Sequence, residues 1–377
     1  MKFTAYSGVQ VFDGTQLHAG KAVLFAEDDA FSALIAVSDL PEDCVHHILD
    51  GGVIGPGFVD LQVNGGGGVM FNDIPSLETL KTIAKSHQGL GVAGFLPTLI
   101  TDTRAKSQAA INATIEAIDA GVEGILGLHL EGPHLSIARK GAHDGTLIRP
   151  MDDADLAMLL DAAAQLPNLK MTVAPENVTR AQVETLAKAG VLVSLGHTDA
   201  DFETCQRWMD AGAHCVTHLF NAMSQLGNRA PGLVGAALNT DHVSAGLIAD
   251  GIHVHPVAMR AALAAKRGPG RVFLVSDAMA VAGSDETEFT LNGRTILRRG
   301  GRLTLADGTL AGADLDLAQA IRTLVQDVGV ALEQALAMAT SIPADLLQKN
   351  LGLGRFEPGK KIRPIWLDRA FDLRVLP

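Results

Sequence analysis

Eight short apolar runs, each followed by a longer stretch with helical character, constrain this chain more than any other feature of its sequence. Successive runs lie about twenty to forty residues apart, which is room for one strand, one helix and two loops. The runs cover residues 58–63, 94–100, 125–130, 170–174, 191–195, 215–219, 243–249 and 272–276. Eight such units in about 250 residues is the size of a (β/α)8 TIM barrel, so we predict this α/β fold.

The two ends of the chain differ in texture from its middle. Residues 1–55 and 352–377 contain short β-like runs separated by turns, and neither end is long enough to form a core by itself. We therefore predict that both termini together build one small β-sandwich domain, next to a barrel domain of residues 56–351.

Within the barrel domain, residues 289–310 indicate a hairpin-like insert. Its turn signals are Asn292-Gly293, Gly300-Gly301 and Asp307-Gly308. Four arginines lie close together in it: Arg294, Arg298, Arg299 and Arg302. The sequence assigns this basic cluster no role beyond that of a solvated flap.

One helix start is marked clearly. Thr198 and Asp201 have the spacing of a capping box, and apolar residues follow from Phe202 at near-helical spacing. Gly212 ends the segment. The pattern predicts a helix whose first turn is capped by Thr198.

The composition excludes several functional classes. With 30 basic and 42 acidic residues the formal charge is −12, which opposes docking onto a nucleic acid or an anionic membrane. No run of about 18 apolar residues is present, so no membrane-spanning helix is expected. The three cysteines form no C-x-x-C pair, which favours reduced thiols. Since no secretory segment is visible, we expect a cytoplasmic protein without nucleic-acid or membrane partners.

The carboxyl ends of the predicted strands carry the chemistry, because these ends meet at the mouth of a (β/α)8 barrel. The runs end in Gln62-Val63-Asn64, His129-Leu130-Glu131, Gly196-His197, Thr217-His218 and Ser276-Asp277. Glu131, His197 and His218 form a suitable ligand set for a divalent cation with one position open to water. Asp277 stands on the last strand, where it is free to take and return a proton.

Other motifs are interpreted as structural. A G-x-G-x-x-G pattern at residues 89–94 precedes a strand instead of following one, so it does not predict a dinucleotide site. P-loop and G-x-S-x-G motifs are absent from the sequence, which removes two common enzyme classes. The remaining histidines near motifs are assigned structural or supporting roles: His87, His129, His134, His242 and His255.

Six segments match the motifs of one enzyme superfamily: PGFVDLQVNG at 56–65, HLEGP at 129–133, GHT at 196–198, THLFNAM at 217–223, DGIH at 250–253 and VSDA at 275–278. In this order they resemble the amidohydrolase superfamily and, within it, the deacetylases of phosphorylated N-acetyl amino sugars. Most superfamily members carry His-x-His on the first strand, whereas Gln62 and Asn64 stand here. Because neutral amides are weak metal ligands, the resemblance implies a single metal at Glu131, His197 and His218.

The resemblance implies a hydrolase that removes the N-acetyl group of N-acetyl-D-glucosamine 6-phosphate and releases D-glucosamine 6-phosphate and acetate. In such enzymes a metal-bound water attacks the acetamido carbonyl, and Asp277 would act first as general base and then as general acid. His143 matches a histidine that hydrogen-bonds this carbonyl. The implied cofactor is one divalent metal ion per subunit, with Zn²⁺ as first choice and Fe²⁺, Mn²⁺ or Co²⁺ as alternatives.

The resemblance also implies how the phosphorylated amino sugar is held. The substrate-binding positions are Gln62, Asn64, Asn221, Ala222, Arg229 and His253. Backbone amides near Asn221 and Ala222, together with His253, would bind the phosphate, and Arg229 would reach it from a neighbouring subunit. We therefore expect a homodimer.

Three alternatives stay open at this point. An epimeric substrate, the galactosamine or mannosamine form, stays possible, because the motifs do not sense the configuration at one ring carbon. A cyclic-amide hydrolase such as a dihydroorotase is disfavoured, because the His-x-His pair is missing and Pro175 rather than a lysine follows the fourth strand. A non-catalytic scaffold is disfavoured because all four residues of the predicted centre are present.

Overall fold

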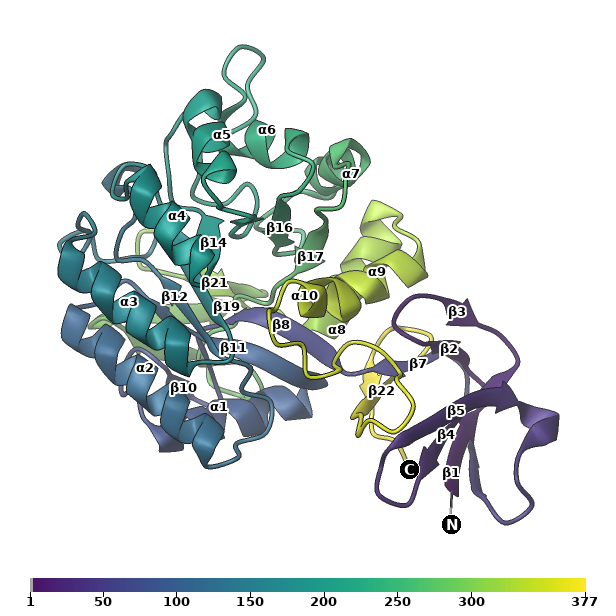
Figure 1. Cartoon of the computed structure of the whole chain (residues 1–377). Coiled ribbons are helices and arrows are strands. Elements are labelled where there is room, and N and C mark those ends of the chain that lie inside the picture. Colours follow the sequence, from purple (N-terminus) through teal and green to yellow (C-terminus); the bar gives the residue numbers. More distant parts are fainter. Residues whose placement is uncertain (1–2) are drawn as a thin grey trace.

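The chain is built around a barrel of eight parallel strands (Figure 1), and the computed structural model describes residues 3–377. The barrel strands are β8 (Phe58–Val63), β11 (Val92–Ile100), β12 (Leu128–Glu131), β13 (Leu169–Val173), β14 (Leu192–Leu195), β15 (Cys215–Val216), β16 (Ser244–Leu247) and β17 (Val272–Leu274). Their order in the sheet follows the chain, and a parallel bridge between Val63 and Ala278 joins the first strand to the segment after the last. Each predicted run overlaps one of these strands, so the (β/α)8 barrel is confirmed.

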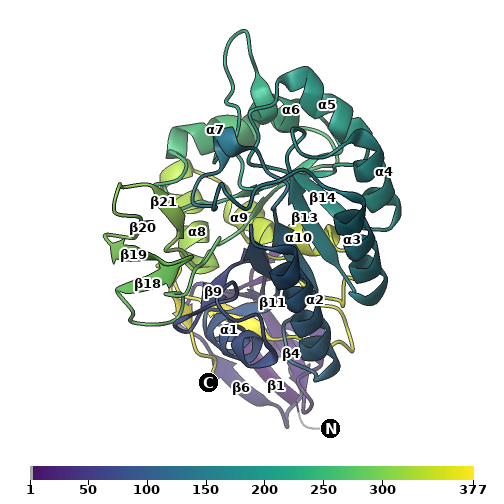
Figure 2. The same cartoon turned by 90° about the vertical axis from the view of Figure 1, so that its left-hand side faces the viewer.

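Helices follow the strands and cover the outside of the barrel (Figures 1 and 2). They are α1 (Leu77–Gly89), α2 (Arg104–Asp119), α3 (Asp153–Gln165), α4 (Arg180–Lys188), α5 (Phe202–Asp210), α6 (Gly232–Asn239), α7 (Pro256–Ala265), α8 (Leu317–Thr323), α9 (Leu332–Ala339) and α10 (Ser341–Asp345). Each of α1 to α5 begins after a Ser, Thr or Asp residue whose side chain accepts a hydrogen bond from the N–H three residues on. Such caps satisfy amide groups that have no partner inside the helix.

The cap of α5 differs from the sequence prediction. Asp201 is the capping residue, and its Oδ1 accepts from the N–H of Thr204 at 2.8 Å. Thr198 instead donates its hydroxyl to Oε2 of Glu176, on the loop after β13, at 2.6 Å. The prediction is wrong because the helix begins three residues later, and the Thr198 hydroxyl accepts from the N–H of Ala200 at 3.0 Å rather than from a helix amide.

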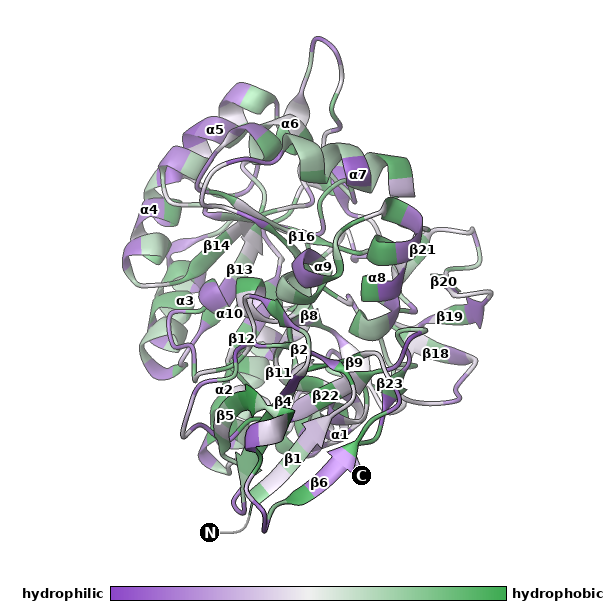
Figure 3. Ribbon diagram, turned by 90° about the vertical axis from the view of Figure 1, so that its right-hand side faces the viewer, coloured by the Kyte–Doolittle hydropathy of each residue, from purple (hydrophilic) through white to green (hydrophobic). Residues whose placement is uncertain are grey.

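One continuous hydrophobic core fills the barrel and the layer between strands and helices. Strands β8, β12, β13, β16 and β17 are buried along their whole length, as expected for parallel strands covered on both faces. Figure 3 shows α4 and α5, on the outside, with both hydrophilic and hydrophobic residues. The strand ends therefore sit on a packed ring that fixes their side chains.

Two smaller sheets lie beside the barrel, and in one of them strands from the two termini lie side by side (Figure 1). One sheet has the order β5-β4-β1-β6 and the other the order β23-β22-β7-β2-β3. Their strands are β1 (Phe3–Ser7), β2 (Gln10–Phe12), β3 (Leu17–His18), β4 (Lys21–Ala26), β5 (Phe31–Ala36), β6 (Val45–Ile48), β7 (Val53–Pro56), β22 (Pro364–Leu367) and β23 (Leu373–Arg374). The pairing of β22 with β7 joins the termini as predicted, and a second apolar core includes Phe25, Phe31 and Phe356. The boundaries at 55/56 and 351/352 stay a prediction.

The insert is an antiparallel sheet of four strands, β18 (Glu288–Leu291), β19 (Arg294–Arg299), β20 (Arg302–Thr304) and β21 (Leu310–Ala313). Its turns fall at the three predicted dipeptides. At the first of them Asn292 and Gly293 both have positive φ, 49° and 73°, as a two-residue hairpin turn requires. Leu291, Ile296 and Leu303 form an apolar core with residues of the barrel. We call residues 288–313 the insert sheet.

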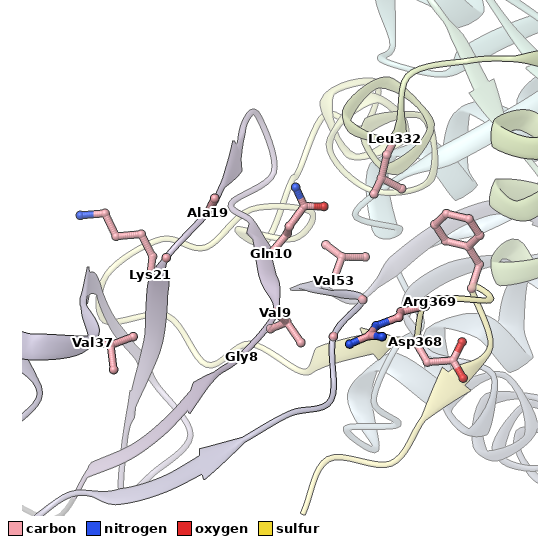
Figure 4. Close-up of a pocket in the computed structure, with 14 residues that line it drawn as sticks. Gly8, Val9, Gln10, Ala19, Lys21, Val37, Val53, Leu332, Asp368 and Arg369 are labelled. Atoms are coloured by element: carbon pink, nitrogen blue, oxygen red, sulfur yellow. The ribbon is translucent and has the colours of Figure 1, made fainter.

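A cavity of about 580 Å³ lies where the small sheets meet the barrel (Figure 4). Its lining comes from the terminal strands, from Leu332 of α9 and from the segment around Arg369. The Lys21 side chain points away from Asp368 and Arg369, so the charged groups do not converge (Figure 4). None of the residues predicted for the metal centre or for proton transfer lines this cavity. Among residues 3–377, no helix is long and apolar enough to cross a membrane.

Candidate active site

Three side chains from separate strand ends converge at the mouth of the barrel. Glu131 ends β12, while His197 and His218 each follow two residues after β14 and β15. Oε1 of Glu131 lies 3.2 Å from Nε2 of His197 and 3.0 Å from Nε2 of His218, and the two nitrogens are 3.1 Å apart. All three side chains are buried. The structure thus brings together the residues that the strand-end pattern places at a metal centre.

The backbone at this site is held in an uncommon conformation. His197, His218 and Asp277 have φ values of 48°, 28° and 50°. Non-glycine residues adopt positive φ at a cost, and such positions gather where the surrounding fold overrides local preference, often at functional sites. Here the conformation turns each side chain at the point where its strand ends.

A hydrogen bond at Nδ1 of His197 shows that Nε2 faces Glu131 with a lone pair. Nδ1 of His197 lies 2.8 Å from the carbonyl oxygen of Arg139. Because a carbonyl only accepts, Nδ1 carries the proton, and Nε2 of the neutral ring presents its lone pair to the carboxylate. Two such electron-rich atoms at 3.2 Å repel each other unless a cation or proton lies between them.

The ligand atoms of Glu131, His197 and His218 fit a divalent metal ion. One carboxylate and two imidazoles are the ligand types of catalytic zinc sites that keep a position open. Nδ1 of His218 is buried and has no hydrogen-bond partner among the described residues. The ring of His218 is therefore engaged in the described structure only through Nε2, on the side of Glu131 and His197.

His143 packs against His197, with ring centroids 4.4 Å apart, but its nitrogens are engaged differently. Nδ1 of His143 accepts from the backbone N–H of Thr101 at 3.3 Å and lies 2.8 Å from the Thr101 hydroxyl. A backbone N–H only donates, so Nε2 of the neutral ring carries the proton. Although Glu131, His143 and His197 also offer atoms within 4.8 Å of one another, His143 keeps no free lone pair. Burial lowers the pKa of His143 to about 3, which leaves a neutral N–H donor.

Asp277 is fixed on one side by two amides. Its Oδ1 accepts from Nδ2 of Asn64 at 2.7 Å and from Nε2 of Gln62 at 3.0 Å. The same Gln62 nitrogen lies 3.2 Å from Oε2 of Glu131. Burial, and then the negative charge of Glu131, raise the pKa of Asp277. A carboxylate that is oriented in this way and has a raised pKa is suited to accept and return a proton.

A cavity of about 390 Å³ opens above these groups. Its lining includes the predicted residues Asn64, Glu131, His143, His197, His218, Asn221, Ala222, His253 and Asp277. Gln62 is fully buried behind the carboxylates and is not part of the lining. Arg229 lies on an exposed loop outside the cavity. The structure of one chain therefore gathers all predicted site residues except Arg229.

Two of the groups predicted to hold the phosphate already have hydrogen-bond partners within the chain. His253 is oriented by Asp250, with Nδ1 2.6 Å from Oδ2. The backbone N–H of Asn221 donates to the carbonyl of His218 at 2.9 Å and is therefore already engaged. Ala222, with φ 50°, lines the cavity beside it.

Two supporting residues were missed by the sequence analysis. Thr101, which sets the protonation of His143, directly follows β11, so the strand-end rule applied to the second run would have found it. Arg139 acts on His197 through its backbone carbonyl. A carbonyl contact has no side-chain signature, so no signal in the sequence points to Arg139.

The chain belongs to the amidohydrolase family, whose sequence model matches residues 53–363. This confirms the resemblance drawn from the motifs. Members of this family are metal-dependent, in agreement with the ligand set around Glu131.

Curated relatives carry more specific names. The N-acetylgalactosamine-6-phosphate deacetylase of Shewanella sp. (strain ANA-3) is 43% identical over 336 residues, which are 89% of this chain and 83% of the relative. The N-acetylglucosamine-6-phosphate deacetylase of Haemophilus influenzae is 36% identical over 315 residues, 83% of this chain and 81% of the relative.

Solved structures agree over the whole length. The N-acetylglucosamine-6-phosphate deacetylase of Pasteurella multocida has a TM-score of 0.92 at 34% identity, covering 98% of this chain and 97% of that one. The corresponding enzyme of Mycobacterium smegmatis has a TM-score of 0.88 at 29% identity, covering 99% and 97%.

Proposed function

We propose that this chain is a metal-dependent deacetylase that hydrolyses N-acetyl-D-glucosamine 6-phosphate to D-glucosamine 6-phosphate and acetate. The observation that carries the proposal is the meeting of Glu131, His197 and His218 within 3.2 Å of one another, beside an oriented Asp277. The relatives and solved structures with this name support the choice of reaction.

The metal site consists of Oε1 of Glu131 and Nε2 of His197 and His218. It takes one divalent ion per subunit, Zn²⁺ by preference, with Fe²⁺, Mn²⁺ and Co²⁺ as alternatives. A bound divalent cation supplies Lewis acidity, which polarises a carbonyl group and acidifies water. Gln62 and Asn64, where many relatives of the superfamily have histidines, are occupied with the two carboxylates and support a single ion.

Two residues of the chain act on the amide. Asp277 accepts a proton from the attacking water and then delivers a proton to the nitrogen of the departing sugar, because an amine leaves poorly as its anion. His143, a neutral donor held by Thr101, hydrogen-bonds the acetyl oxygen as negative charge develops on it.

The phosphate of the sugar is bound at the opposite end of the substrate by His253, by Arg229 and by backbone amides next to Asn221, such as that of Ala222, because the N–H of Asn221 itself donates to His218. Asn64 faces the cavity, and Gln62 acts from behind the carboxylates. Arg229 is supplied by the neighbouring subunit of a homodimer, because it lies outside the cavity of its own chain. The enzyme works in the cytoplasm, where phosphorylated sugars are retained.

The proposal is tested by a turnover panel in which metal is quantified in the same preparation. Purified enzyme is given the 6-phosphates of N-acetyl-glucosamine, N-acetyl-galactosamine and N-acetyl-mannosamine, and acetate release is measured. We expect turnover of a 6-phosphorylated N-acetylhexosamine with about one divalent ion per chain. A preparation that is loaded with zinc and releases no acetate from any of the three would favour the scaffold alternative.

A second candidate substrate is the galactosamine epimer. It is favoured by the Shewanella relative of that name, which at 43% exceeds the identity of the Haemophilus relative at 36%. The two epimers differ at one hydroxyl. The same panel decides between them, because the preferred substrate has the larger kcat/KM.

A further inference from the structure

The insert sheet contacts the candidate active site at two places. At the end of β21 the N–H of Ala313 donates to the carbonyl of Asp277 at 3.0 Å. On β19, Nη2 of Arg294 donates to the carbonyl of Ala142. Its residues Leu291, Thr309, Leu310 and Gly312 also line the cavity. Figure 2 shows these strands as a sheet beside the barrel, and the contacts make that sheet one wall of the site.

The contact of Arg294 falls on the peptide that directly precedes His143. This part of the chain lies on the loop between β12 and α3, where the N–H of His143 donates to the carbonyl of Lys140 at 3.0 Å. Thr101 holds the other side, at Nδ1 of the His143 ring. The backbone and the ring of His143 are therefore tied at opposite ends, and Arg294 supplies the tie that comes from outside the barrel.

Arg294 is the member of the basic cluster that reaches the site. Arg298 donates to Oδ2 of Asp314 and to the carbonyl of Ser284, both at 2.9 Å, and so stays within the insert region. Arg299 and Arg302 are exposed, and among the described residues neither side chain makes a hydrogen bond to the site loops. A guanidinium is suited to this task, because it keeps its charge and its planar fork loses little freedom on binding.

We propose that Arg294 is a positioning residue for the reaction: by holding the Ala142 carbonyl it sets the placement of the His143 N–H that meets the acetyl oxygen. The proposal rests on the proposed function and gives the basic insert a role. A donor displaced by about 1 Å loses much of its catalytic effect. Substrate binding through the phosphate, which involves other residues, is affected much less.

The test compares Arg294→Ala with the matched control Arg302→Ala. We expect Arg294→Ala to lower kcat about tenfold to a hundredfold, with KM and metal content near those of the parent; Arg302→Ala should leave all three unchanged. Guanidinium ion at millimolar concentration should restore part of the kcat of Arg294→Ala, whereas sodium at the same concentration should not. In ¹⁵N-histidine spectra of the metal-free protein, the His143 signal should move in Arg294→Ala only.

A double variant separates positioning from general stabilisation. Because Arg294 acts through His143, we expect Arg294→Ala to slow a His143→Gln enzyme no further. A full additional loss in that background would overturn the proposal, as would an unchanged kcat in Arg294→Ala or an equal effect of Arg302→Ala. Failure of the proposed function is distinguishable, because the parent enzyme itself would then release no acetate.

Discussion

At the scale of single residues, the partner of one imidazole nitrogen decides what the other nitrogen can do. His197 and His143 lie side by side, yet a carbonyl at Nδ1 frees the Nε2 lone pair of the first, while an amide N–H at Nδ1 leaves the second with an Nε2–H. The first is suited to a metal and the second to a carbonyl oxygen. Strand-end position alone does not separate these roles, because it says nothing about backbone partners.

This difference predicts metal content. His218→Ala should leave the enzyme with much less than one divalent ion per chain after dialysis, because one of three ligand atoms is lost. His143→Ala should keep its metal while losing activity, and it is the matched control, as both rings are buried in the same cavity. Metal analysis of the two variants shows whether His218 or His143 is the third ligand beside Glu131 and His197. The reverse pattern would show that His143 and not His218 is the ligand.

Replacement of Asp277 tests the proton transfer. Asp277→Asn keeps an oxygen that accepts from Gln62 and Asn64 but removes the group that takes a proton, so kcat should fall about 10²–10⁴-fold with metal retained. Steady-state kinetics with metal analysis measure both. Asp210→Asn, at the exposed end of α5, is the control and should behave as the parent. Turnover of Asp277→Asn near the parent rate would remove Asp277 from its role.

At the scale of elements, the sequence predicts what depends on local signals. Barrel strands covered on both faces appear as continuous apolar runs, and even β15, with two residues, is found because its run continues to Leu219. The turns of the insert are found because Asn292-Gly293 suits a positive φ. The cap of α5 is predicted at Thr198 instead of Asp201, because both are residues of capping type and the contact between Thr198 and Glu176 leaves no signal in the local sequence.

A buried histidine in α1 predicts how the stability of the protein depends on pH. His87 in α1 lies 2.9 Å from the carbonyl of Gly65 through Nε2 and is 2% exposed. Burial lowers its pKa to about 4, whereas the unfolded chain titrates near 6.5. As the pH falls, the unfolded state therefore binds the proton first. The contribution of neutral, buried His87 to the free energy of unfolding is complete above pH 6.5 and is lost as the pH falls toward 4.

Urea unfolding of the metal-free protein at pH 7 and pH 4.5 checks this expectation. The parent should lose about 2–3 kcal/mol more than His87→Gln over this interval, since glutamine keeps a donor for the carbonyl but does not titrate. Other histidines titrate alike in both proteins and cancel in the difference. Equal losses would show that His87 is not the group responsible.

At the scale of the whole molecule, the site is completed by parts that the barrel pattern does not include. The insert sheet contributes a wall of the cavity, and its contact with the loop before His143 joins residues 152 positions apart. A contact of that kind depends on how two loops meet in space, so the sequence showed the basic cluster but not its target. Arg229 is not part of the cavity lining and lies on the exposed segment between β15 and α6, which projects at the top of Figure 2.

The proposed phosphate contact and the proposed homodimer give Arg229 a testable role. Arg229→Ala should raise KM for a 6-phosphorylated substrate by about one to two orders of magnitude through loss of a charge-assisted bond, and should change turnover of the unphosphorylated sugar little. If the arginine acts in the partner's site, its effect depends on which chain of the dimer carries the change. In the proposed symmetric dimer each chain would supply its own Asp277 and receive the arginine of the other.

A hybrid dimer makes this dependence visible. One chain carries Arg229→Ala with one affinity tag, the other carries Asp277→Asn with a second tag, and the mixed dimer is isolated over both tags. The Arg229→Ala chain keeps Asp277 and receives Arg229 from its partner, so one complete site forms and kcat/KM should be about half that of the parent dimer. If Arg229 acted within its own chain, the hybrid would hold no complete site and would be as weak as the variants alone.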